Sequence, residues 1–239
     1  MKLFDLYIRI LKKQVWLYMI YMAVFLAFIQ LVQGAGKQMP PSAALALYYR
    51  NAVLVLMVLI MLTISAVTAV TSNVELSMRH RAAPVRIELL ELRYVGADLL
   101  VMLFWWMLFF WTAVVLYGEV SYSIGGLLMA VDMLTVSLLS TAIGLLIGIF
   151  AKTGQGRGIA SNLIALVLVF AGGDASVYVA GDQTVYFLRS FTPIFWYQKA
   201  LQEMNLENYA IYIGIQLMFA VAVLAFGMML DKQRKEQVN

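Results

Sequence analysis

The chain has 239 residues, of which 63% are hydrophobic and 13% charged, with a formal net charge of +4 and no cysteine. A soluble domain is about half apolar and about a quarter charged, so this composition excludes an ordinary soluble protein and indicates a chain in a lipid bilayer. The lack of cysteine excludes disulfides, thiolate catalysis and cysteine-ligated metals.

Residues 1–13, MKLFDLYIRILKK, carry their charges on one side of a predicted helix. At about 100° per residue, the charged side chains share a narrow arc and apolar side chains cover the remainder. The charged residues are Lys2, Asp5, Arg9, Lys12 and Lys13. This pattern predicts an N-terminal amphipathic helix that lies in the cytoplasmic membrane interface and contacts membrane lipid. The alternative is a basic flank that only orients the first span.

Six predominantly apolar runs follow, each about long enough to cross the roughly 30 Å hydrocarbon core as a helix. They cover residues 15–32, 52–70, 99–117, 127–150, 159–177 and 209–230. The sequence therefore predicts an all-α polytopic membrane protein with six transmembrane helices in a single domain, residues 1–239.

Lysine and arginine are distributed unequally between the two sides of these spans. Only Lys37, Arg50, Arg189 and Lys199 lie on one side, and all the others lie on the opposite side. Because basic residues accumulate in cytoplasmic segments, both termini are predicted to be cytoplasmic. The expected location is a cell membrane, either a bacterial inner membrane or a plasma membrane. The high pI of about 9.2 follows from these segments and does not indicate binding to nucleic acid.

Residues 71–98 form a predicted cytoplasmic loop that contains the charged stretch MRHRAAPVRIELLELR and the only histidine. Pro84 can occupy the first turn of a helix, where its missing N–H costs nothing. On such a helix an apolar ridge runs between a basic strip and an acidic strip, with Val85 and Leu89 on the ridge, Arg86 on one side and Glu88 on the other. This arrangement predicts a short helix that binds a groove on another protein. A solvated connector whose arginines set the topology is the alternative.

The fourth predicted span contains an acid and a row of small residues. Asp132 lies about two turns inside the span, and an ionisable residue within the membrane is by default a candidate functional residue, here on a transport pathway. The alternative is that it only caps polar neighbours near the headgroups. Ser140, Gly144 and Gly148 form a ridge of small residues, which predicts close helix packing within a core that includes spans four and five.

Residues 172–208 form the longest predicted segment outside the spans. Part of it, VYFLRSFTPIFWYQKAL, is too apolar for a free loop and too short for a further span. We expect two short re-entrant helices in the outer leaflet, broken at Thr192-Pro193, because helix is disfavoured directly before proline. The predicted outer gate consists of Phe187, Phe191, Pro193, Phe195 and Trp196. An interfacial aromatic belt is the alternative.

Several kinds of chemistry lack the residues that they require. The single histidine, His80, lies in a predicted loop, so a serine or metal-dependent protease within the membrane is excluded. The phosphate-binding motif GxxxxGK[ST] is absent, so any ATP-driven work requires a partner. The chain is therefore expected not to be an enzyme and to bind no cofactor of its own.

Four stretches in this order resemble the short permeases of the ABC-2 transporter superfamily. They are the amphipathic start, RHRAAPVRIELLE before span three, AIGLLIGIFAKTGQGRGIASNLIALVLVFAGG across spans four and five, and FTPIFWYQKAL before span six. The resemblance implies a permease subunit of an ATP-binding cassette exporter that moves a hydrophobic or amphipathic substrate, such as a drug, peptide, lipid or glycan, out of the cell.

The same resemblance implies the partners and their contacts. Two permeases, identical or paralogous, would assemble with two ATPase subunits that bind ATP and Mg²⁺. A cytoplasmic coupling helix would contact the ATPase through Arg81, Pro84, Val85, Arg86, Glu88 and Leu89. Two other classes of protein stay open: a secondary transporter, which would need coupling residues at mid-membrane, and a non-transport scaffold or immunity protein.

Overall fold

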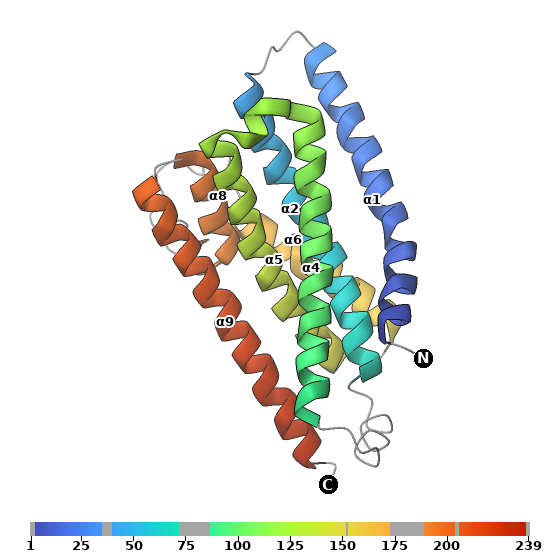
Figure 1. The fold of residues 1–239 in the computed structure, drawn as a ribbon. Helices are drawn as coiled ribbons and strands as arrows, with labels where there is room; N and C mark the ends of the chain where they lie inside the picture. Colours follow the sequence, from blue (N-terminus) through green and yellow to red (C-terminus); the bar gives the residue numbers. More distant parts are fainter. Residues whose placement is uncertain are drawn as a thin grey trace.

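The computed structural model describes residues 3–34, 40–71, 87–151, 153–172, 189–203 and 206–237. These residues form helices and short connections, and no strand occurs among them (Figure 1). In chain order the elements are α1 (Leu3–Gly34), α2 (Pro41–Thr71), α4 (Ile87–Tyr117), the 3-10 helix η1 (Gly118–Tyr122), α5 (Ile124–Phe150), α6 (Gly154–Gly172), α8 (Pro193–Glu203) and α9 (Leu206–Gln237).

Five helical stretches are long and apolar enough to cross a membrane: Pro41–Ala69, Gly96–Tyr122, Ile124–Phe150, Gly154–Gly172 and Asn208–Leu230. The expectation of an all-helical chain with several spans is confirmed at this level. The first expected span, residues 15–32, lies within α1 but is not among these five, so the sixth span stays a prediction.

The second span begins earlier than the apolar run that predicted it. Arg50 and Asn51 interrupt that run, and the sequence therefore indicated a start at Ala52. The helix begins instead at Pro41. Proline is favoured in the first turn because its fixed φ suits a helix, and neither arginine nor asparagine breaks a helix that has begun.

Two predicted short helices are continuous with the long helices that follow them. α1 runs without interruption for 32 residues, so residues 3–13 are its first turns rather than a separate element. α4 likewise continues from Ile87 into the third span. Neither stretch contains a proline that would end the helix. The interfacial position of the first turns of α1 and the coupling role of the start of α4 stay predictions.

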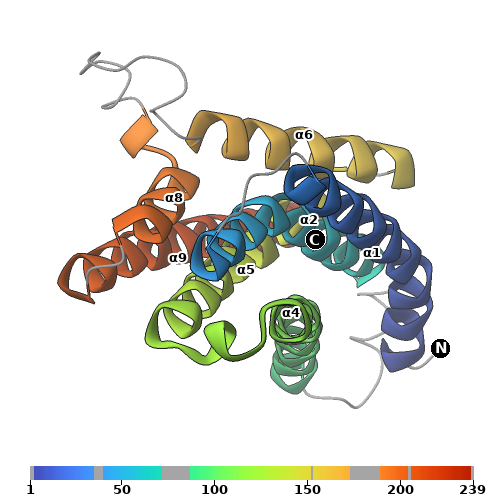
Figure 2. The same cartoon turned by 90° about the horizontal axis from the view of Figure 1, so that it is seen from above.

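α2 and α5 form the centre of the bundle and pack against each other, while the other helices surround them (Figure 2). In the most apolar window of α5, 72% of the residues are buried, and in that of α6 only 11%. The start of α1 and the end of α9 lie at one end of the bundle, whereas η1 and α8 lie toward the other end (Figure 1).

Candidate functional site

A polar network joins α5 to α9 inside the bundle. Asp132 on α5 has no exposed surface, and its Oδ1 accepts a hydrogen bond from Nε2 of Gln216 on α9 at 2.6 Å. Oε1 of the same glutamine accepts a hydrogen bond from the Thr135 hydroxyl, also at 2.6 Å. The three side chains therefore fix the relative position of the two helices.

This network retains an unused capacity for hydrogen bonding. Oδ2 of Asp132 and the hydroxyl of Tyr49 on α2 are buried, and neither has a hydrogen-bond partner among the described residues. The nearby Tyr209 hydroxyl donates to the Leu128 carbonyl, one turn before Asp132. Buried polar atoms are rarely left without a partner, so each of these two atoms could bind a polar group of a ligand or an ion.

The sequence indicated Asp132 as a candidate pathway residue, but it did not indicate the residues around it. Gln216 is a single polar residue within the last apolar run, so the sequence alone could have indicated it as a candidate residue of the site. Tyr49 and Tyr209 could not be recognised, because tyrosine is also common in spans as an interfacial anchor.

The ridge of small residues on α5 lies against α2. A Cβ atom added at Gly144 would meet the Met61 Cα at 3.1 Å, and one added at Gly148 would meet the Thr68 Cβ at 2.5 Å. The hydroxyl of the buried Ser140 donates to the Val136 carbonyl of its own helix at 2.7 Å. The ridge therefore packs span four on span two, whereas the sequence associated it with spans four and five.

α8 begins at Pro193, where the sequence predicted a break. The hydroxyl of Thr192 donates to the Arg189 carbonyl at 2.7 Å, which closes the turn before the helix. Tyr197 is fully buried and donates to the Tyr49 carbonyl at 2.9 Å. At Gly172, the last residue of α6, an added Cβ would lie 2.6 Å from the backbone nitrogen of residue 195. α8 therefore contacts α2 and α6 at these points, and it also packs on α5 and α9.

The predicted gate residues lie in different environments. Pro193 and Phe195 are buried, and Trp196 is half-buried, with its indole N–H donating to the Ser190 carbonyl at 2.8 Å. Phe191 is 61% exposed. Phe187 lies outside the described residues. The structure therefore brings Phe195 and Trp196 into the packing of α8 and leaves Phe191 on the surface.

The predicted contacts for an ATPase lie mostly outside the described residues. These are Arg81, Pro84, Val85 and Arg86. Glu88 and Leu89 belong to the first turn of α4. In the described part of the chain, no group of three or more histidine, aspartate or glutamate side chains could hold a metal ion.

The five apolar helices identify the chain as a helical multi-pass membrane protein. Comparison with protein-family models, curated proteins and solved structures gives no match. The function is therefore argued from the sequence pattern and from the arrangement of the helices.

Proposed function

We propose that this chain is the transmembrane permease subunit of an ATP-driven exporter that carries hydrophobic or amphipathic substrates across the cell membrane, with both termini in the cytoplasm. The proposal has two supports: the resemblance of four stretches to ABC-2 permeases, and the placement of α8. The second is the structural observation that carries it.

α8 is too short to cross a bilayer. Its 11 residues rise about 1.5 Å each, so it spans roughly half of the ~30 Å hydrocarbon core. It nevertheless contacts α2, α5, α6 and α9, and it buries Ile194 and Tyr197 completely. Elements that enter the membrane without crossing it are tolerated where protein surrounds them or where they line a cavity. A helix of this kind suits the outer end of a translocation path better than it suits a simple scaffold.

The energy for transport would come from a separate subunit, because the chain contains no phosphate-binding motif. Two permeases would assemble with two ATPases, and each ATPase would contact the segment from Arg81 to Leu89. ATP can shift the permease only if this segment binds the ATPase differently in two states of the transporter.

The proposal is tested by co-expressing the chain with an ATPase encoded beside it and purifying the permease. We expect the ATPase to co-purify. Leu89→Asp should release it or uncouple ATP hydrolysis from transport, because a charge on the apolar ridge would disfavour binding in an apolar groove. Gln155→Asp, on an exposed residue in the first turn of α6, is the matched control. An ATPase that never co-purifies, or identical behaviour of the two variants, contradicts the proposal.

A secondary transporter is the second candidate, and the buried network around Asp132 is the observation that favours it. An ion-coupled transporter uses intramembrane acids of this kind. Transport into vesicles that contain the chain alone, driven by an ion gradient and abolished by Asp132→Asn, would select this function instead.

A further inference from the structure

The carboxyl group of Asp132 is enclosed by protein and accepts a single hydrogen bond. Its side chain has no exposed surface. Gln216 donates to Oδ1, whereas Oδ2 is buried without a hydrogen-bond partner among the described residues. An ionised carboxylate accepts up to about four hydrogen bonds and donates none. A single hydrogen bond would therefore leave most of the accepting capacity of an ionised Asp132 unused.

The neighbouring donors are directed to other acceptors. The Thr135 hydroxyl donates to Oε1 of Gln216 at 2.6 Å, and the Tyr209 hydroxyl donates to the Leu128 carbonyl. Tyr209 also interacts electrostatically with Asp132 and with Tyr49 on α2. In this arrangement no described donor contacts Oδ2, so nothing stabilises a negative charge on that atom.

No basic side chain in the described part of the chain compensates a charge on Asp132 through a hydrogen bond. The charged residues described on the elements that pack against α5 are Arg50 on α2, Asp98 on α4, Glu119 in η1, Arg157 on α6 and Lys199 on α8. Apart from the exposed Glu119, each of these has an interaction of its own. An unpaired carboxylate is so costly to bury that such a group takes up a proton and becomes neutral.

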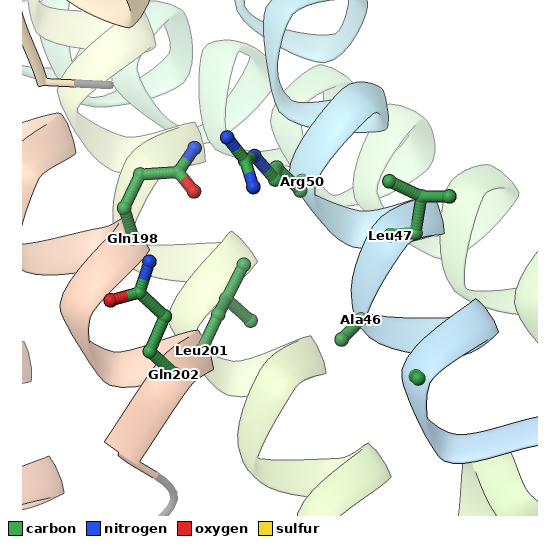
Figure 3. A pocket seen from close by; sticks show the side chains of 7 residues that line it. Ala46, Leu47, Arg50, Gln198, Leu201 and Gln202 are labelled. Atoms are coloured by element: carbon green, nitrogen blue, oxygen red, sulfur yellow. The ribbon is translucent and has the colours of Figure 1, made fainter. Parts of the chain in front are cut away.

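The enclosure of the site limits the size of its ligand. Figure 3 shows a cleft of about 260 Å³ between α2 and α8, lined by Arg50, Gln198, Leu201 and neighbouring side chains. Neither Asp132 nor Tyr49 lines this cleft. A metal ion such as Mg²⁺ or Ca²⁺ requires about six oxygen ligands, whereas a proton requires one oxygen atom and no additional space. A proton is therefore the cation that fits the single oxygen without a partner.

We propose that Asp132 is a proton-binding site, in which Oδ2 holds a proton taken from solvent while Oδ1 accepts from Gln216 as a carbonyl oxygen. The O–H bond that forms converts the carboxylate into a neutral acid. Loss of this proton places a charge with one hydrogen bond at the contact between α5 and α9, so the packing of these two helices depends on pH. The site goes beyond ATP-driven transport, because its occupancy requires neither a nucleotide nor a transported substrate.

Infrared spectroscopy of the purified full-length chain in detergent tests the proposal, because a protonated carboxyl group and a carboxylate absorb at different frequencies. We expect the native chain at neutral pH to show a protonated-carboxyl band that is missing in Asp132→Asn. Glu119→Gln, which removes an exposed carboxyl group, is the matched control and should keep the band. Labelling the aspartate carboxyl groups of the native chain with carbon-13 should shift the band, which identifies it without any substitution. Absence of the band would overturn the proposal.

The dependence of stability on pH is the second readout. An aspartate in the unfolded chain loses its proton at about pH 4, whereas a folded Asp132 that keeps its proton makes unfolding more favourable as the pH rises. Relative to Asp132→Asn, the folding equilibrium constant of the native chain should fall about tenfold per pH unit above about pH 5, until the folded site also ionises. Tyrosines ordinarily keep their protons below about pH 9 and do not contribute in this range. Equal pH dependence of the two chains contradicts the proposal.

Salt distinguishes a proton from a metal cation at this site. The native chain should unfold at the same denaturant concentration in sodium chloride, potassium chloride and choline chloride of equal ionic strength, because a neutral acid needs no further cation. Stabilisation by sodium or potassium but not by choline would assign the site to a metal ion instead of a proton.

Discussion

At the scale of single residues, Gly148 shows how closely the two central helices approach each other. An added Cβ would also lie 2.9 Å from the Ser65 carbonyl oxygen on α2, besides its clash with Thr68. In lipid, the hydrophobic effect does not drive two helices together, because lipid tails are as apolar as the helix surfaces. Helix association therefore depends on the close packing that small residues allow.

Gly148→Ala should therefore lower the stability of the protein by about 1–3 kcal/mol, the usual range for overpacking. The melting temperature in detergent measures this effect. Gly214→Ala on α9 is the matched control, because no atom lies within 4 Å of its added Cβ, and it should be neutral or slightly stabilising. Equal melting temperatures for the two variants would show that the helices can separate at this point without cost.

Asp132 permits a second prediction at this scale. Asparagine keeps an oxygen that accepts the hydrogen bond from Gln216, so Asp132→Asn should melt close to the native chain. Asp132→Leu leaves the buried amide without its partner and should cost about 1–3 kcal/mol. If the asparagine variant loses as much stability as the leucine variant, the carboxylate itself is required for the packing of α5 on α9.

At the scale of elements, α8 is the helix whose placement needs explanation. Its position depends on a bend closed by Thr192, on the lack of a side chain at Gly172 and on the hydrogen bond from Tyr197 to α2. These three contacts come from three different parts of the chain, so the position of α8 depends on tertiary packing rather than on its own sequence.

Tyr197→Phe should lower stability by about 0.5–1.5 kcal/mol, because it removes one buried hydrogen bond and little volume. Tyr122→Phe in η1 is the matched control, since that side chain is exposed. Thermal unfolding of the two variants in the same detergent measures the difference. If neither variant changes the melting temperature, the hydrogen bond from Tyr197 to the Tyr49 carbonyl does not stabilise the position of α8.

The gate can be tested at Phe191 alone. Phe195 is buried, so its removal would disturb packing and hide any effect on transport, whereas Phe191 is exposed. Phe191→Ala should leave the melting temperature unchanged. If the residue helps to close the path, the variant should leak substrate or change substrate preference in vesicle assays. Native transport, leak and selectivity in this variant would exclude Phe191 from the gate.

At the scale of the whole molecule, the helices place the connection between α5 and α6 at the end that holds the termini, and η1 at the opposite end. Glu119 in η1 and Gln155 at the start of α6 are both exposed. Since the chain has no cysteine, single cysteines at these positions report the side of the membrane without background.

We expect Glu119→Cys to react with an impermeant thiol reagent in intact cells, and Gln155→Cys to react only after the membrane is opened. The unequal distribution of basic residues is the physical reason. Labelling of Gln155→Cys from outside would invert the proposed orientation. Labelling of both variants from outside would contradict an odd number of spans between them.

Only part of the candidate site could be predicted from the sequence. Asp132 could be recognised because an acid is costly inside an apolar run wherever the run lies. Its partner Gln216 is 84 residues away, and no local pattern relates the two positions.

The sequence by itself determined that the chain is helical, where the apolar centres of five spans lie and that a helix begins at Pro193. These features follow from the length of apolar runs and from the geometry of proline, which are local properties. Only the tertiary structure decided that α2 and α5 are central and that α6 is peripheral. The physical reason is that lipid is as apolar as the interior of the protein, so a buried helix need not be more hydrophobic than a helix that faces lipid. The buried α5 is accordingly no more hydrophobic than the peripheral α4 and α9.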